Sequence, residues 1–314
     1  MTAKHAPSVR HLAQISEATN VAGIRFLFRV CRIFGRRPLR LFLYPVLVWY
    51  VLTRPEARMA SKKYLGKIAQ AQNQNTQPGF FQVLAHFKAF GESILDRLLL
   101  WNGLFDTENV VTNIHPSVQE CLDSNRGFLL ICSHFGNLEL SKVLSRQKQD
   151  LKITMLVHTR HALAFNRILM QIDPMSQTDM MQVTDMTPAT AVLLAEKIRL
   201  GECVAIAGDR IPVSTDPRVV AASFLGEKAL FPVGPYVLAF LLKCPVFLMF
   251  SMQNSTGPEL HIEPFREMIE LPRKDRQRIF DELAADYAAR LEAWCLVTPL
   301  EWFNFYDFWQ NPKN

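Results

Sequence analysis

The sequence predicts an α/β fold, in which helices flank a central, mostly parallel or mixed sheet and a helical N-terminal segment anchors the chain to a membrane. Short apolar runs alternate along most of the 314 residues with amphipathic stretches of helical period, as in sheets that helices cover on both faces. The chain is 49% hydrophobic and 20% charged, with only 13 glycines, which excludes disordered and low-complexity classes. The third observation is a concentration of positive charge at the N-terminus.

Residues 1–67 contain thirteen Lys and Arg but only Glu17 and Glu56, a net charge of +11, so the rest of the chain carries −5 of the total of +6. The first 20 residues lack the apolar core of a secretory signal, and we therefore expect the working part of the chain in the cytoplasm. We divide the sequence into a basic and apolar segment over 1–67 and an α/β domain over 79–314, joined by the polar residues 69–78.

Residues 21–53 have the pattern of an interfacial membrane anchor. Arginines recur at helical spacing on one face, at Arg25, Arg29, Arg32 and Arg36. Thirteen uncharged residues then separate Arg40 from Arg54, fewer than the roughly 20 of a spanning helix. A basic amphipathic helix followed by a short apolar helix suits the surface of an anionic leaflet. A buried core helix is the alternative for the apolar run. Nucleic acid, the other partner for a basic stripe, does not suit the adjoining apolar residues, so we expect a membrane and no nucleic acid.

The hydrophobic periodicity of the remaining chain predicts its helices and strands in order. Expected helices cover residues 79–105, 117–125, 138–146, 163–172, 188–200 and 273–294, and expected strands cover 109–114, 127–132, 151–157, 203–207, 245–251 and 260–263. Pro188 opens one helix and Gly201 follows its end, as helix boundaries prefer. Ligands of such sheets bind at the carboxyl ends of the strands, so we expect functional residues there.

The first candidate residues follow the apolar strand 127–132. His134 comes just after the strand, and Glu139 lies five positions further, beyond a turn that Gly136 eases. We expect Glu139 to bond one ring nitrogen of His134 and leave the other free to take a proton, as in a general base. Asn137, in the same turn, is a candidate substrate contact. A structural histidine is the alternative, because His115 and Glu120 repeat the spacing where Pro116 starts a helix.

Further candidates follow two other strands. Asp209 and Arg210 come directly after strand 203–207, and an arginine there is suited to a phosphate or a carbonyl oxygen, with a loop salt bridge as the alternative. After strand 151–157, Arg160 is a candidate anion contact in a polar cluster that also contains His158, His161 and Asn166. Residues 224–235 supply either an apolar wall for a substrate chain or core packing.

The six cysteines are widely spaced, mostly in apolar runs and without a CxxC pair, which favours reduced, buried thiols and gives no zinc signature. The sequence contains no GxSxG elbow, GxxxxGK[ST] phosphate loop, GxGxxG after a strand or HExxH. These absences weigh against serine hydrolase, nucleotide-dependent and zinc-protease chemistry.

Taken in order, the basic N-terminal segment, SHFGNLE, AGDRIP, FLGEKALFPVGP and the closing PLEWFNFYDFW resemble the lysophospholipid acyltransferase superfamily. Within it, the bacterial lipid A biosynthesis acyltransferase branch is the most similar, in particular its stand-alone acyltransferases found beside fatty-acid and aryl-polyene synthesis enzymes. Trp302-Phe-Asn-Phe-Tyr306 departs from the tryptophan–arginine pattern that closes the lipid A enzymes, so the acceptor stays open.

The resemblance implies an acyltransferase at the cytoplasmic face of the bacterial inner membrane. It implies transfer of an acyl group from acyl carrier protein or coenzyme A to a hydroxyl or amine of a lipid or glycolipid, with the thioester as co-substrate and no metal or other cofactor. His134 is expected to deprotonate the acceptor, Glu139 to orient it, and Asp209 and Arg210 to shape the site, with Arg210 meeting a phosphate. Two alternatives stay open: an aminoacyl transferase, and a non-catalytic membrane scaffold in a lipid-synthesis complex.

Overall fold

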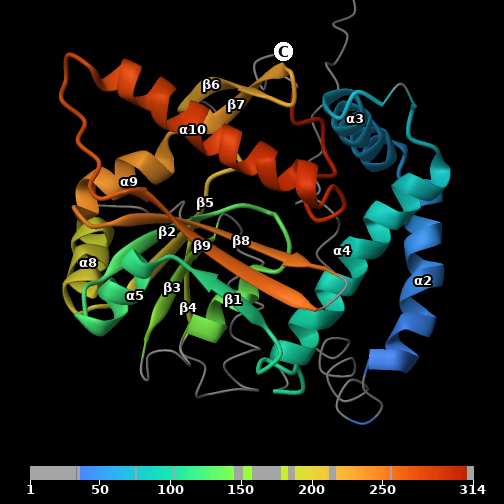
Figure 1. The fold of residues 1–314 in the computed structure, drawn as a ribbon, viewed down its shortest axis with the longest axis horizontal. Coiled ribbons are helices and arrows are strands. Elements are labelled where there is room, and N and C mark those ends of the chain that lie inside the picture. Colours follow the sequence, from blue (N-terminus) through green and yellow to red (C-terminus); the bar gives the residue numbers. More distant parts are fainter. Residues whose placement is uncertain are drawn as a thin grey trace, which may run out of the picture.

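The computed structural model describes residue 33 and residues 36–74, 76–101, 103–144, 151–157, 178–182, 188–211, 217–254 and 257–309. Within them, seven strands form one sheet in the order β1-β9-β8-β2-β5-β3-β4 (Figure 1). In chain order these are β1 (Val111–Ile114), β2 (Phe128–Cys132), β3 (Ile153–Val157), β4 (Thr178–Gln182), β5 (Cys203–Ala207), β8 (Val246–Gln253) and β9 (Pro258–Arg266). Only the β8–β9 pair is antiparallel. The predicted α/β fold with a mostly parallel sheet is confirmed.

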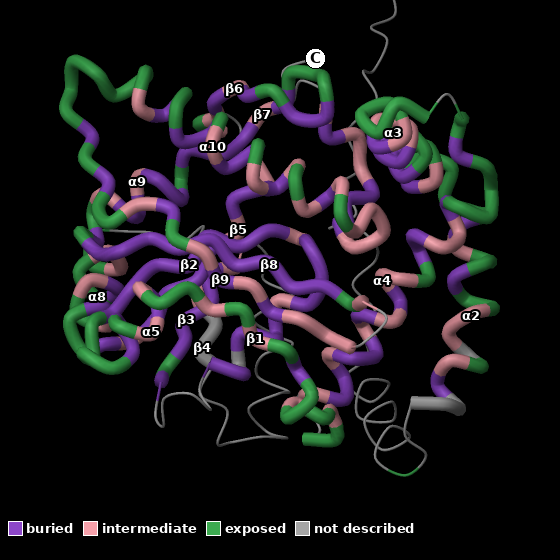
Figure 2. The backbone as a smooth tube through the Cα atoms, in the orientation of Figure 1, coloured by how far each residue is buried: buried purple, intermediate pink, exposed green. Residues whose placement is uncertain are grey.

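Two core clusters, one on each face of the sheet, explain why its strands are apolar throughout. Ile131 and Val204 share one cluster with residues of α8 (Pro188–Arg199), α9 (Gly234–Leu242) and α10 (Arg276–Val297). Leu130 and Ala205 share the other with α5 (Pro116–Asp123) and the 3-10 helix η2 (Leu138–Val143). β2 is accordingly buried along its whole length, and β5 and β8 are buried except at their last residue (Figure 2).

Three helices lie at one side of the sheet: α2 (Arg36–Thr53), α3 (Pro55–Ala71) and α4 (Phe80–Trp101). Gly91 of α4 lets α2 approach closely, because a Cβ there would lie 2.7 Å from Leu47 Cδ1. Arg40 and Tyr44 of α2 bond to Glu92 at 2.8 and 2.6 Å. Tyr64 of α3 is 1% exposed within the main core. These helices therefore pack as part of the body.

α2 has two apolar faces. Leu39, Leu47 and Val51, spaced by multiples of four residues, are buried, whereas Leu41, Trp49 and Leu52 are 58–73% exposed. In Figure 1, α2 is the outermost of the three helices, on the far side of α4 from the sheet. No helix in the described part of the chain is long and apolar enough to cross a membrane. The short apolar helix expected within 21–53 is present as α2, which begins at Arg36; Arg25, Arg29 and Arg32 of the predicted basic face lie outside the described residues.

A two-stranded hairpin, β6 (Val219–Phe224) and β7 (Glu227–Pro232), packs on α10. Its turn residues Leu225 and Gly226 both have positive φ, 50° and 77°, as a tight two-residue hairpin requires. Phe224 and Phe231 are fully buried and pack edge-on against each other. Phe224 and Phe231 of this segment therefore pack in the core.

Candidate functional site

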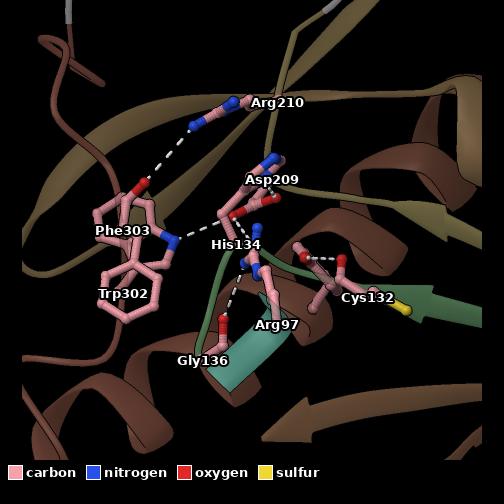
Figure 3. Close-up of polar contacts among 9 residues, drawn as sticks. Arg97, Cys132, His134, Gly136, Asp209, Arg210, Trp302 and Phe303 are labelled. Atoms are coloured by element: carbon pink, nitrogen blue, oxygen red, sulfur yellow. Dashed lines mark hydrogen bonds and ion pairs between the residues drawn. The ribbon is translucent and has the colours of Figure 1, made fainter. Parts of the chain in front are cut away.

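The register of β2 on β5 brings together the polar residues that follow these two strands. Cys132 lies opposite Ala207, and the Gly208 N–H donates to the Cys132 carbonyl at 2.8 Å. Two residues beyond each strand, His134 Nδ1 donates to Asp209 Oδ1 at 2.8 Å, and the His134 main-chain N–H donates to Oδ2 at 2.7 Å. One carboxylate thus fixes both the ring and the backbone of His134 (Figure 3).

The C-terminal segment completes the coordination of this carboxylate. Trp302 Nε1 donates to Asp209 Oδ2 at 3.0 Å, so Asp209 receives three N–H bonds and is only 2% exposed. Residues 301–303 lie along the turn after β2: Phe303 N donates to the His134 carbonyl at 2.8 Å, and Gly136 N donates to the Glu301 carbonyl at 2.7 Å. Residues 301–303 therefore fix the turn after β2 through main-chain hydrogen bonds.

The turn itself depends on Gly136. Its φ of +67° is left-handed, and a Cβ there would lie 1.8 Å from the Ser251 carbonyl oxygen of β8. Only glycine combines this conformation with such a close backbone approach. The turn therefore places His134 at the carboxyl edge of the sheet, where its side chain is 26% exposed.

The electrostatics of the pair favour a neutral imidazole beside an ionised carboxylate. Burial and the positive charge of Arg210 lower the pKa of His134, and these effects exceed the opposing effect of Asp209. Burial raises the pKa of Asp209, but its interactions with His134 and Trp302 outweigh burial and lower it. Since Nδ1 carries the proton given to the carboxylate, Nε2 carries the free lone pair. Such an imidazole can accept a proton.

The carboxylate bonded to His134 belongs to Asp209 and not to Glu139, for which sequence spacing predicted this contact; no hydrogen bond joins Glu139 to His134 among the described residues. The reason is local: after Gly136 the chain enters the 3-10 helix η2, in which Glu139 is buried and its main-chain N–H is capped by Asn137 Oδ1 at 3.1 Å. The charge of Glu139 instead raises the pKa of Arg97, against the lowering effect of burial.

The other candidates have mixed outcomes. Arg210 lies at the site, where its guanidinium donates to the Phe303 carbonyl at 3.5 Å and lies 5.9 Å from the centre of the Tyr306 ring. Asn137 is 7% exposed, and its Nδ2 has no hydrogen-bond partner in the described residues. Arg160 lies outside the described residues, as do His158, His161 and Asn166.

His115, which repeats the His134 spacing, is structural. It precedes α5, where its Nδ1 accepts from the Ser117 main-chain N–H at 3.3 Å. The five cysteines in the described residues are all free and buried: Cys121, Cys132, Cys203, Cys244 and Cys295. Ser133 beside His134 is fully buried, so it is not placed as a nucleophile.

Sequence reasoning did not identify two residues of the site. Trp302 lies 93 positions from Asp209, and the aromatic density of residues 302–309 was its only signal. Arg97 of α4 donates to the Gly136 carbonyl at 3.4 Å, and nothing in its helix distinguishes it from a surface arginine.

A histidine held by a buried carboxylate at the strand ends of a mostly parallel sheet has the arrangement that a general base requires. Residues 110–311 match the family model described as bacterial lipid A biosynthesis acyltransferase. This match covers more than half of the chain, which therefore belongs to that family and is an acyltransferase acting on a lipid acceptor. A search of curated proteins found no significant match.

Proposed function

We propose that His134 is the general base for acyl transfer from a thioester, carried by acyl carrier protein or coenzyme A, to a hydroxyl or amine of a lipid or glycolipid. Nε2 takes the acceptor proton as the acceptor attacks the thioester carbonyl, and the imidazolium returns that proton to the departing thiolate. A thioester is already activated, so positioning, a base and oxyanion stabilisation suffice.

The observation that carries this proposal is the bond from His134 Nδ1 to Asp209 Oδ1 at 2.8 Å. It fixes the tautomer whose Nε2 can accept a proton, and Asp209 stabilises the imidazolium formed during the reaction. Trp302 then acts as a positioning residue, because its indole N–H holds the second oxygen of Asp209. No covalent acyl-enzyme is required.

Arg210 is the proposed contact for a phosphate of the donor or acceptor. A guanidinium beside an aromatic ring keeps N–H donors for a planar anion, and Arg210 lies next in sequence to the carboxylate that holds the base. Glu139 is proposed to balance the positive charge that Arg97 and Arg210 place around His134.

The exposed face of α2 supports docking to the cytoplasmic face of the inner membrane. Leu41, Trp49 and Leu52 are 73%, 61% and 58% exposed on one helix, and neighbouring Arg54 is also exposed. Apolar side chains on a surface helix beside cations suit an anionic interface. Cosedimentation with vesicles of phosphatidylglycerol tests this: Trp49→Glu should weaken binding, and Trp309→Phe, which alters a tryptophan packed on Phe224, should not. Equal binding by both variants would contradict the docking surface.

A coupled assay tests the catalytic proposal. Purified protein is incubated with acyl carrier protein or coenzyme A thioesters and lipid acceptors, and product is identified by mass spectrometry. The expected result is a new acyl ester or amide that His134→Ala does not form. An aminoacylated product would favour the aminoacyl alternative, and a His134→Ala strain with a wild-type lipid profile would favour the scaffold.

A further inference from the structure

Among the residues that the structure describes, Arg97 is the one cation at the site to which no role has been assigned. It extends from α4 toward His134, as the close-up shows (Figure 3). Its Nη2 donates to the Gly136 carbonyl at 3.4 Å, which is long for such a bond. This contact ties the guanidinium to the turn that carries the base, although α4 lies 39 positions earlier in the sequence.

The guanidinium has donors to spare. Arginine carries five N–H donors in a fixed fork, and the Gly136 carbonyl is the only acceptor bonded to Arg97 within the described residues. Its Nε is buried and has no hydrogen-bond partner there. Buried polar groups in native structures almost always have a partner, so a donor left open beside a reaction centre points to a ligand atom.

The surrounding charges define what kind of atom that is. The positive charges of Arg97 and Arg210 both lower the pKa of His134, so both lie close enough to act on the ring. Arg210 lies against the Phe303 carbonyl and Tyr306, whereas Arg97 bonds to the main chain two residues after His134. Two guanidinium charges beside His134 suit a negatively charged oxygen that develops next to the ring.

We infer that Arg97 is a catalytic residue whose guanidinium binds the oxyanion formed on the thioester carbonyl; this rests on the proposed function. As His134 Nε2 takes the acceptor proton, the acceptor oxygen or nitrogen bonds to the carbonyl carbon, and the carbonyl π electrons move to its oxygen. Arg97 holds that negative oxygen by N–H donation. The carbonyl then re-forms, the C–S bond breaks, and the thiolate takes the proton from His134.

Steady-state kinetics of Arg97→Ala and Arg97→Lys test this role. Loss of an oxyanion donor lowers kcat by roughly 100- to 1,000-fold, so Arg97→Ala should show that loss with a nearly unchanged KM for the thioester. Arg97→Lys, which keeps the positive charge but lacks the planar guanidinium, should recover part of the lost kcat. The acid limb of the kcat/KM profile should move to higher pH in Arg97→Ala, because a charge that lowers the pKa of His134 is gone. Arg126→Ala, which removes an exposed arginine paired with Glu267, is the matched control.

Thermal melting establishes that each variant is folded. If Arg97→Ala does not fold, Arg97→Lys provides the test, and a kcat of Arg97→Lys equal to that of wild type overturns the inference. A raised KM with unchanged kcat in Arg97→Ala also overturns it, because Arg97 would then bind the ground state. His134→Ala distinguishes failure of the oxyanion role of Arg97 from failure of the proposed function. If it is inactive while the Arg97 variants match wild type, only the oxyanion role fails; if it is fully active, the proposed function fails.

Discussion

Asp209→Asn should force His134 into the tautomer that cannot act as a base. Asp209 Oδ2 accepts from two N–H groups, the main chain of His134 and the indole of Trp302, and neither group can accept a hydrogen bond. The asparagine oxygen must therefore stay on that side, which turns its NH₂ toward His134 Nδ1. Nδ1 then becomes the acceptor, and the ring proton moves to Nε2, where the lone pair is needed.

The expected loss is large although the side chain hardly changes shape. In a serine protease, the same Asp-to-Asn substitution of the carboxylate that orients the catalytic histidine lowers kcat by about 10⁴ through the wrong tautomer, which corresponds to about 5 kcal/mol. Acyl-transfer rates measure the loss, and ¹⁵N chemical shifts of the His134 ring report the tautomer. Glu139→Gln is the control: with no described bond to His134, it should leave the tautomer unchanged. An Asp209→Asn variant within tenfold of wild type, or one that keeps the Nδ1–H tautomer, would refute the reasoning.

Three further results are expected. Trp302→Phe removes one N–H bond to a buried carboxylate, so it should cost about 2 kcal/mol of stability and lower kcat about tenfold; an unchanged kcat would show that the indole does not position the base. Gly136→Ala and Gly226→Ala both place a side chain at positive φ, for about 1 kcal/mol, but only Gly136→Ala meets a backbone oxygen, at 1.8 Å. The first should lower the free energy of unfolding by at least about 4 kcal/mol, and equal melting temperatures would be inconsistent with that contact. His86, fully buried between Ser61 and the Trp302 carbonyl, has its pKa lowered by burial to about 4. As pH falls, the imidazole of His86 takes up its proton in the unfolded chain before it does so in the folded protein. Up to about 3 kcal/mol of folding stability should therefore be lost between about pH 6.5 and pH 4. Urea unfolding of wild type and His86→Gln across this range measures the loss, and identical pH slopes for the two proteins would contradict the prediction.

The sheet was predictable because its strands are buried on both faces and read as continuous apolar runs. Phe128–Cys132 and Cys203–Ala207 were placed within a residue, and the expectation that both ends lie on one edge brought His134 and Asp209 to the same region. β4 was not predicted, since Thr178–Gln182 contains an aspartate and a glutamine in five residues. Of the helix expected over 138–146, residues 138–143 form the 3-10 helix η2, and residues 145 and 146 lie outside the described residues.

The partner of His134 was not predictable from spacing along the chain. A carboxylate five residues away can reach the histidine ring most easily if the chain turns directly into an α-helix, whereas here it enters a 3-10 helix. The Asp209 contact depends on the register between β2 and β5, which periodicity does not report. Trp302 and Arg97 reach the site from other elements, so tertiary packing alone brings them there.

The most direct test of the account is quantitative acyl transfer by purified wild type and His134→Ala, with thiol release and lipid product measured in one reaction. Wild type should release one thiol for each acyl group found on the lipid, and folded His134→Ala should give neither product above background. Transfer by His134→Ala at the wild-type rate would contradict the central claim that this imidazole, held by Asp209, activates the acceptor.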